Sequence, residues 1–205
     1  VDSGTIRRAD GRSTAGRSHV TCRDIAYLPQ DRTVHWDLSV ARVVGLGRLA
    51  HAQRHNDERA VDAAMTRMDI GHLAERSIRE VSGGERARVL IARALAQETP
   101  VLLADEPVAG LDPAHQLSLF EHLRTMAHEG KAVLVALHDL SLALRFADRV
   151  VLMHEGRVVA DGPPGGTLTR DRIAEVFGID SRIEMVGGIP IFVPQPLAPG
   201  EAPGR

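Results

Sequence analysis

Two adjacent carboxylates follow a short apolar run near the middle of the chain. Residues 101–104 are all apolar, and Asp105 and Glu106 come directly after them. An apolar run of this length without polar alternation is typical of a strand buried on both faces of a parallel sheet. Ligands of open α/β sheets bind at the carboxyl ends of the strands, so one acid could coordinate Mg²⁺ while the next deprotonates a water. Taken alone, the pair is explained as well by an acidic turn before Pro107.

A second candidate site is a glycine-containing helix start. Ser82, Gly83, Gly84 and Glu85 follow one another, and Ser-x-x-Glu is the capping-box pattern. The two glycines allow a ligand to approach the backbone closely, and the free N–H groups and positive dipole end of a helix attract anions. Taken alone, these four residues are better explained as an ordinary capped helix.

Three more polar residues stand at the ends of predicted elements. Gln30 follows an apolar run at 25–28, Asp112 ends the segment Ala109-Gly110-Leu111-Asp112, and His138 ends an apolar run at 132–137. Each has an ordinary explanation: a turn residue, a helix cap, and a neutral histidine in the core or at its rim. The occurrence of all these features in this order is not expected by chance.

Alternating strands and helices would position these residues. Asp112 and Pro113 open a long helix as its N-cap and first residue, and Gly130 closes it. The predicted helices are 39–46, 57–68, 85–97, 113–130, 140–146 and 170–177, and the predicted strands are 25–28, 101–104, 132–137, 149–153 and 157–160. We interpret residues 31–98 as a helical subdomain inserted between strands of an α/β sheet.

The two ends of the chain differ in composition from the rest. Residues 1–23 are rich in Gly, Ser and Arg, with at most a short strand near Thr5 and Ile6, and residues 194–205 predict a disordered tail because they are rich in Pro, Gly and Ala. The polar first residues do not predict a signal peptide. A chain that begins with Val1 is expected to be a processed product or a fragment of a longer one.

Composition narrows the class of protein. The chain has 205 residues, of which 43% are hydrophobic, which suffices for one α/β domain. Its formal net charge of -2 gives no indication of a nucleic-acid partner. The single cysteine, Cys22, excludes a disulfide within the chain and favours a reducing compartment. No apolar run approaches the length of a membrane span.

From residue 1 to about 180, the motifs and their order along the chain resemble those of the ATPase subunit of ATP-binding cassette (ABC) transporters. The segment ending at Gln30 is similar to the Q-loop, whose Gln reaches Mg²⁺ and the attacking water. Asp105 and Glu106 match the Walker B motif, which implies Mg²⁺ binding by Asp105 and a general base at Glu106. His138 matches the switch histidine that contacts the γ-phosphate.

Two further matches concern a second subunit. Residues 81–85 resemble the signature motif, with Val81 and Glu85 in place of the commoner Leu and Gln, and Asp112 ends a segment that matches the D-loop. In the family, the signature motif binds the γ-phosphate of ATP held by the opposite subunit. This implies a nucleotide-binding role for Ser82, Gly83, Gly84, Glu85 and Asp112.

The resemblance implies a P-loop NTPase-like fold with a mostly parallel sheet, in which residues 1–180 form the ATP-binding domain and 181–205 a C-terminal strand and tail. It also implies ATP and Mg²⁺ as cofactors. The implied partners are a second ATPase subunit, in a homodimer, and membrane-spanning permease subunits, with no nucleic acid. The implied location is the cytoplasmic face of the cell membrane. Within the family, residues 36–48 are most similar to importer ATPases for iron-siderophores, haem and vitamin B12.

The family's Walker A motif, Gly-x-x-x-x-Gly-Lys-[Ser/Thr], does not occur in these residues. Lys131 is the only lysine and does not lie in a glycine-rich loop. Residues 11–18 fit the pattern with Arg in place of Lys, but no buried strand precedes them and residues 19–23 leave no room for a following helix. Residues 2–6 instead resemble the segment that follows the Walker A helix. We therefore expect the N-terminal part of the cassette to be missing, and the 205 residues alone neither to bind ATP tightly nor to hydrolyse it.

Two alternatives remain open. The chain could be a non-catalytic cassette that acts as an interaction module, which the missing Walker A favours and the intact Asp105, Glu106 and His138 oppose. It could also be a DNA-repair or chromosome-organising ATPase with the same motifs. Those proteins carry long heptad coiled coils before the signature, for which residues 31–81 leave no room, and the chain has no basic patch.

Overall fold

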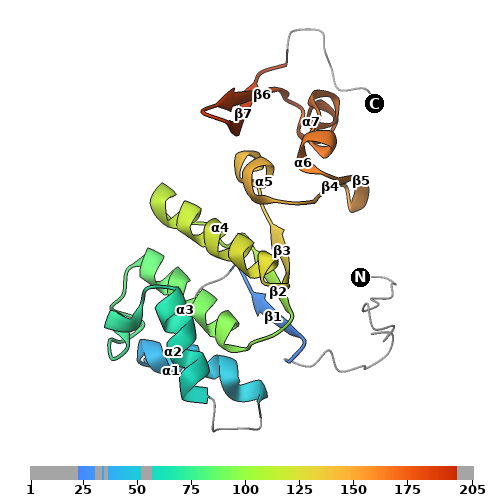
Figure 1. The fold of residues 1–205 in the computed structure, drawn as a ribbon. Helices are drawn as coiled ribbons and strands as arrows, with labels where there is room; N and C mark the ends of the chain where they lie inside the picture. Colours follow the sequence, from blue (N-terminus) through green and yellow to red (C-terminus); the bar gives the residue numbers. More distant parts are fainter. Residues whose placement is uncertain (1–22, 31–33, 35–36, 52–56, 198–205) are drawn as a thin grey trace. The chain divides into compact units, whose positions relative to one another are not determined.

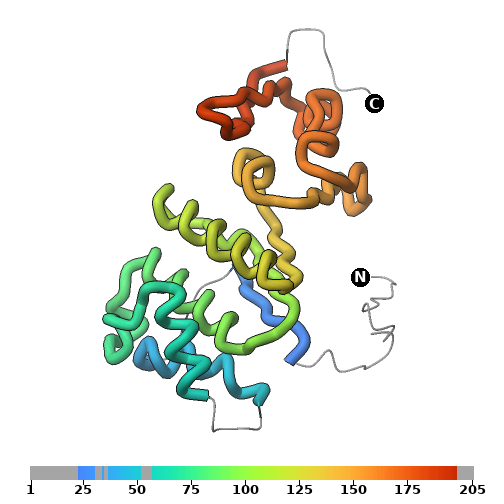
Figure 2. Tube along the Cα trace, in the orientation of Figure 1, coloured from blue at the N-terminus to red at the C-terminus, as the bar shows by residue number. Residues whose placement is uncertain are grey.

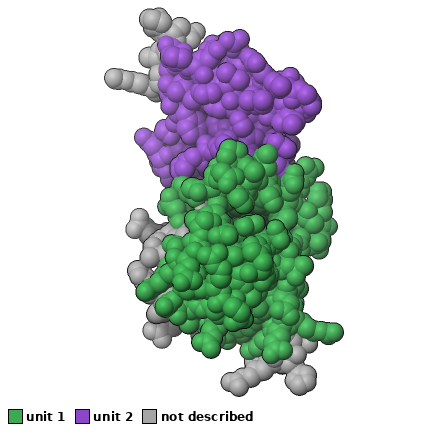
Figure 3. All heavy atoms as spheres, turned by 90° about the vertical axis from the view of Figure 1, so that its left-hand side faces the viewer, with its two compact units in different colours: residues 1–136 green, residues 137–205 purple. Residues whose placement is uncertain are grey.

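The computed structural model describes residues 23–30, 34, 37–51 and 57–197. The chain divides into two compact units, residues 1–136 and residues 137–205 (Figure 3). The strand predicted near Thr5 and Ile6, the Walker A-like segment 11–18 and the last eight residues of the predicted tail lie outside the described residues. The boundary between the units, after residue 136, differs from the predicted end of the ATP-binding domain at residue 180. The predicted domain, 1–180, stays a prediction.

The first unit contains a parallel sheet in the strand order β1-β2-β3 (Figure 1). Its strands are β1 (Ile25–Leu28), β2 (Val101–Asp105) and β3 (Ala132–Ala136). Leu28 pairs with Ala104, and Asp105 pairs with Ala136. The carboxyl ends of all three strands therefore meet at one edge of the sheet, as the sequence predicts.

Helical segments separate β1 from β2 along the chain, and Figure 2 follows the chain through them. They are α1 (Val40–Gly45), η1 (Leu46–Ala50), α2 (Asp57–Arg67), η3 (Gly71–Leu73) and α3 (Gly83–Ala96). Their apolar faces pack together and bury residues such as Val43, Val44, Met65 and Val89. The predicted insertion of helices between two strands of the sheet is confirmed.

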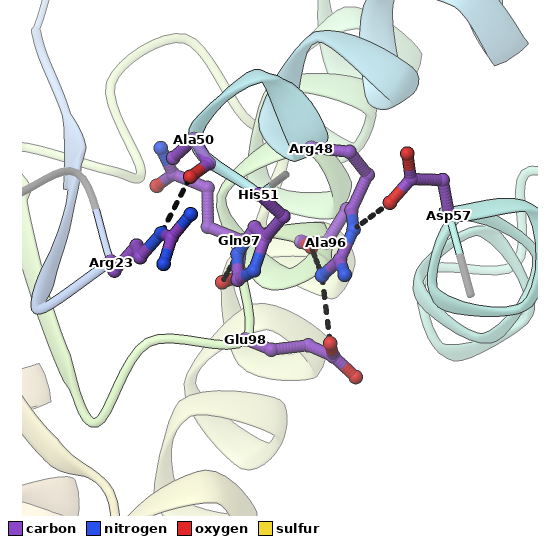
Figure 4. Close-up of polar contacts among 8 residues, drawn as sticks. All are labelled: Arg23, Arg48, Ala50, His51, Asp57, Ala96, Gln97 and Glu98. Carbon is purple, nitrogen blue, oxygen red and sulfur yellow. Dashed lines mark hydrogen bonds and ion pairs between the residues drawn. The ribbon is translucent and has the colours of Figure 1, made fainter. Parts of the chain in front are cut away.

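A buried arginine fastens the first part of this insertion to the end of α3 (Figure 4). Arg48 is only 6% exposed. Its Nη1 donates to the Ala96 carbonyl and to Glu98 Oε2, both at 2.7 Å, and its Nε donates to Asp57 Oδ1 at 3.0 Å. Next to it, a ring nitrogen of His51 lies 2.8 Å from the carbonyl oxygen of Gln97. The guanidinium is thus paired on several sides, as a buried charge requires.

One face of the sheet is less covered than the sequence predicts. Leu102 and Ala104 are buried, but Tyr27 is 54% and Leu134 63% exposed. These two flank Leu103 in one row across the three strands. The prediction that residues 101–104 and 132–137 are buried strands is therefore wrong for this face, because successive side chains of a strand point to opposite faces and the described residues of the first unit cover only one.

The other elements of the first unit include α4 (Pro113–His128), which follows the N-cap Asp112. The second unit contains α5 (Leu140–Phe146), α6 (Pro164–Thr167), α7 (Arg170–Phe177) and two antiparallel hairpins. The hairpin strands are β4 (Val150–His154), β5 (Arg157–Gly162), β6 (Asp180–Val186) and β7 (Ile189–Gln195). A core around Ala143, Leu152, Leu168 and Ile173 holds this unit together.

The last hairpin corrects the sequence prediction for the tail. Residues 194 and 195 belong to β7, so the predicted disorder of 194–205 is wrong at its start. The turn is made by Gly187 and Gly188, whose φ angles are +59° and +81°. Two glycines between apolar runs are a hairpin pattern, because turns of this kind require positive φ.

The close approach of η1 to α3 yields a prediction for two neighbouring glycines. A Cβ added at Gly47 would lie 2.2 Å from the Arg93 carbonyl oxygen, whereas one at Gly45 would meet nothing within 4 Å. Gly47→Ala should therefore lower the free energy of unfolding by about 1–3 kcal/mol through overpacking. Gly45→Ala is the control and should be neutral or stabilising by about 0.4–1 kcal/mol. Urea denaturation measures both, and equal midpoints would contradict the close packing.

Candidate active site

Gln30 and Glu106 meet at the carboxyl edge of the parallel sheet. Gln30 follows β1 by two residues and Glu106 follows β2 directly. Gln30 Nε2 donates a hydrogen bond to Glu106 Oε2 at 3.0 Å, although 76 positions separate the two residues. Gln30 is exposed and Glu106 is half-buried, so the bond lies at the surface of the unit. Two predicted catalytic residues are thus in direct contact.

Backbone geometry holds Glu106 in place. Its φ angle is +44°, in the left-handed region that residues other than glycine seldom adopt. Its N–H donates to the Ala136 carbonyl of β3 at 3.1 Å, and its carbonyl accepts from the N–H of Ala109 at 3.2 Å. Such a conformation costs on the order of 1–3 kcal/mol and is concentrated at functional sites. The turn after β2 therefore gives Glu106 a defined direction at the end of the strand.

Asp105 is the last residue of β2, where it pairs with Ala136, and its side chain is half-buried. Within the described residues, no group of three or more His, Cys, Asp or Glu side chains is arranged to hold a metal ion. Mg²⁺ in nucleotide sites is held by one or two protein ligands together with phosphates and water. A carboxylate at Asp105 and an amide oxygen at Gln30 are hard oxygen donors of the kind that such a site uses. These two assignments stay predictions.

The start of α3 has the predicted capping box. Ser82 N–H donates to Glu85 Oε2 at 2.8 Å, and Glu85 N–H donates to Ser82 Oγ at 3.2 Å. The bond from the Ser82 backbone, helped by the Ser82 hydroxyl, holds the pKa of Glu85 below its usual value. A Cβ at Gly83 would meet nothing within 4 Å, so the space beside this backbone is open. The geometry suits an anion, but the role itself stays a prediction.

Asp112 caps α4 and contacts His115, a histidine that lies outside the predicted motifs. Its Oδ1 accepts from the backbone N–H of His115 at 3.0 Å, and its Oδ2 accepts from Nδ1 of the same residue. The bond from the His115 backbone, followed by the one from its side chain, lowers the pKa of Asp112. The His115 ring also lies beside Gly84, 3.8 Å from where a Cβ would be. The predicted signature and D-loop segments therefore lie next to each other within the first unit.

His138 belongs to the second unit, two residues beyond the end of β3. Asp139 follows it and caps α5 by accepting from the N–H groups of Ser141 at 2.8 Å and Leu142 at 3.1 Å. The cap fixes the chain direction just after His138. The predicted contact of His138 with a γ-phosphate stays a prediction.

The parallel sheet with helices inserted between its first two strands is the arrangement of a cassette of the P-loop NTPase type. The chain belongs to the ABC transporter family, because the family model described as ABC transporter matches residues 1–109. Within the described residues, no helix combines the length and apolar character that crossing a membrane requires. The predicted family and fold class are confirmed.

Curated relatives support the same placement. The chain is 45% identical over 184 residues to the hemin import ATP-binding protein HmuV of Pseudomonas entomophila, covering 86% of this chain and 72% of that protein. It is 43% identical over 185 residues to the cobalamin import ATP-binding protein BtuD of Halobacterium salinarum, covering 88% of this chain and 46% of that protein. The chain therefore spans less than half of the second relative. The predicted similarity to haem and vitamin B12 importer ATPases is confirmed.

Solved structures show the fold independently. An ABC transporter in an inward-facing conformation matches with a TM-score of 0.76 and 25% identity, over 83% of this chain and 72% of that chain. The dimeric structure of a bacterial ABC transporter cassette matches with a TM-score of 0.69 and 25% identity, over 80% of this chain and 74% of that chain. Cassettes of this fold are thus known both within transporters and as dimers.

The capping box at the start of α3 makes a prediction that does not depend on function. Ser82→Ala removes the hydroxyl acceptor and should lower the free energy of unfolding by about 0.5–2 kcal/mol. It also removes one of the two bonds that lower the Glu85 pKa, so this pKa should rise part of the way to its ordinary value. Carboxyl-selective NMR titration measures the pKa. Ser82→Thr is the matched control because it keeps a hydroxyl, and the pKa of Glu85 should stay low in it. An unchanged Glu85 pKa in Ser82→Ala would contradict the geometry.

Proposed function

We propose that this chain is the part of an ABC importer's ATP-hydrolysing cassette that carries the hydrolytic side chains, with hydrolysis in the full-length protein at the carboxyl edge of the β1-β2-β3 sheet. The hydrogen bond of 3.0 Å between Gln30 and Glu106 carries the proposal. It places a carboxylate and an amide side by side where open α/β sheets bind ligands. A general base needs to be within hydrogen-bond reach of a water that is correctly placed, and the pair supplies both the base and a group to place the water.

In the proposed reaction, the oxygen of a water attacks the γ-phosphorus of ATP, and the bond from that phosphorus to the bridging oxygen of ADP breaks. The Glu106 carboxylate accepts the proton of the water. The Gln30 amide orients both the water and the carboxylate, since one of its N–H groups is already bonded to Glu106. Asp105 would hold Mg²⁺, which neutralises charge on the phosphates when bound. His138 would contact the γ-phosphate.

The start of α3 is proposed to act on the nucleotide of a second cassette. Ser82, Gly83, Gly84 and Glu85 present a helix N-terminus, with open space beside Gly83. Such a terminus favours bound phosphate through its N–H groups and dipole. The likeness to a dimeric cassette supports a homodimer. In it, Asp112 would lie close to the same nucleotide. Its further partners would be membrane-spanning permease subunits, which would place the chain on the inner face of the membrane.

The proposed cargo is haem, cobalamin or an iron-siderophore. The names of two relatives, a hemin import and a cobalamin import protein, support this class. Haem and cobalamin are both metal ions held in a large organic ring. A non-catalytic interaction module remains the alternative function. The contact of Gln30 with Glu106 favours catalysis over this alternative, because an interaction module has no need for an oriented carboxylate.

Replacing the base tests the proposal. In the full-length protein, Glu106→Gln should reduce the rate of ATP hydrolysis by roughly 10²–10⁴-fold, the usual contribution of a positioned general base. Binding of a fluorescent ATP analogue should be unchanged, because the amide has nearly the same shape. Glu121→Gln, at an exposed position of α4, is the matched control and should hydrolyse ATP at the parent rate. Parent-like hydrolysis by Glu106→Gln would exclude Glu106 as the base.

A further inference from the structure

His115 connects two segments that the proposed function assigns to the nucleotide of a second subunit. It lies in the first turn of α4, three residues after the N-cap Asp112. Its side chain is 37% exposed, and that of Asp112 is 57% exposed. Neither the signature pattern nor the D-loop pattern includes this position. Its side chain is nevertheless bonded to Asp112 and lies beside Gly84.

On one side, His115 occupies both oxygens of the Asp112 carboxylate. The backbone N–H donates to Oδ1 at 3.0 Å and the ring Nδ1 donates to Oδ2. The backbone bond alone would cap the helix, as it does at most helix starts. The second bond restricts rotation of the carboxylate, so that Asp112 has one direction relative to α4. It also fixes the proton of a neutral imidazole on Nδ1.

On the other side, the same ring lies beside the start of α3. The position of a Cβ on Gly84 is 3.8 Å from His115 Nδ1, 3.9 Å from its Cε1 and 3.9 Å from Leu111 Cδ2. A Cβ there would thus be in ordinary van der Waals contact with both side chains, so the ring and the leucine are neighbours of the first turn of α3. One imidazole is therefore bonded to the carboxylate of Asp112 and lies beside the Gly84 backbone, with room for about one carbon atom between them.

We propose that His115 is a positioning residue that couples the start of α3 to Asp112, so that both segments reach the second subunit's nucleotide in a fixed relative position. The inference rests on the proposed function of these segments. His115 acts through Asp112 and the α3 backbone and does not itself touch the reacting atoms. Since small displacements of groups that position a substrate reduce the rate strongly, loss of the Nδ1–H bond lowers the turnover number.

Three variants of the full-length protein separate the hydrogen bond from the packing. His115→Asn keeps an N–H donor at the position of Nδ1, His115→Phe keeps a ring without the donor, and His115→Ala removes both. We expect His115→Ala and His115→Phe to lower kcat by about tenfold, with the KM for ATP and the binding of a fluorescent ATP analogue unchanged. His115→Asn recovers most of kcat. The pKa of Asp112, measured by NMR, rises in His115→Phe and stays low in His115→Asn.

The outcomes distinguish this inference from the proposed function. Glu106→Gln is measured in parallel, and its parent-like hydrolysis would overturn the proposed function. If Glu106→Gln is slow but His115→Phe turns over like the parent, the coupling role of His115 is wrong and the proposed function stands. Equal kcat values for His115→Asn and His115→Phe also overturn the inference, even if His115→Ala fails to fold. Matching thermal midpoints of the Asn and Phe variants exclude a general loss of stability as the cause.

Discussion

The candidate site depends on the parallel, in-register pairing of β1 with β2. Leu28 lies opposite Ala104, and this register alone brings residues 76 positions apart to hydrogen-bond distance at Gln30 and Glu106. A strand rises by roughly 3.3 Å per residue and alternates its side chains between faces. A slip of one residue would therefore move the amide by more than the length of the bond and turn neighbouring side chains to the opposite face. The position of Asp105 depends on the neighbouring pairing of β2 with β3, in which its partner is Ala136.

The helices between β1 and β2 offset the entropy cost of this long-range pairing. A flexible connection of this length would carry a closure entropy that grows slowly with its length, in addition to the cost of ordering each residue. Here the connection has its own apolar core and its own polar anchors, above all Arg48 with its bonds to Ala96, Glu98 and Asp57. The end of the insertion, α3, leads directly into β2. The same helix also carries the predicted signature at its start, so one element links the two halves of the proposed site.

Much of this fold follows from local rules. The capping residues Ser82, Asp112 and Asp139 start their helices where the sequence indicates, because the cap is a contact between neighbours in the chain. The meeting of Gln30 and Glu106 follows from the rule that parallel strands align their carboxyl ends. The exposure of Leu134 does not follow, since an apolar run shows that a residue is suited to burial and not what covers it. The placement of His115 beside Gly84 brings two helix starts together, and no local pattern specifies such a placement.

A double-mutant cycle on ATP hydrolysis tests most directly whether Gln30 and Glu106 act as one unit. Single-turnover rates are measured for the parent, Gln30→Ala, Glu106→Gln and the double variant. Groups that act as a unit have strongly non-additive effects. Gln30→Ala should therefore lower the hydrolysis rate of the parent clearly. When it is added to Glu106→Gln, it should lower the rate further by less than about threefold. If the two losses multiply in the double variant, the residues act independently, and the 3.0 Å contact between them is not the centre of the hydrolytic site.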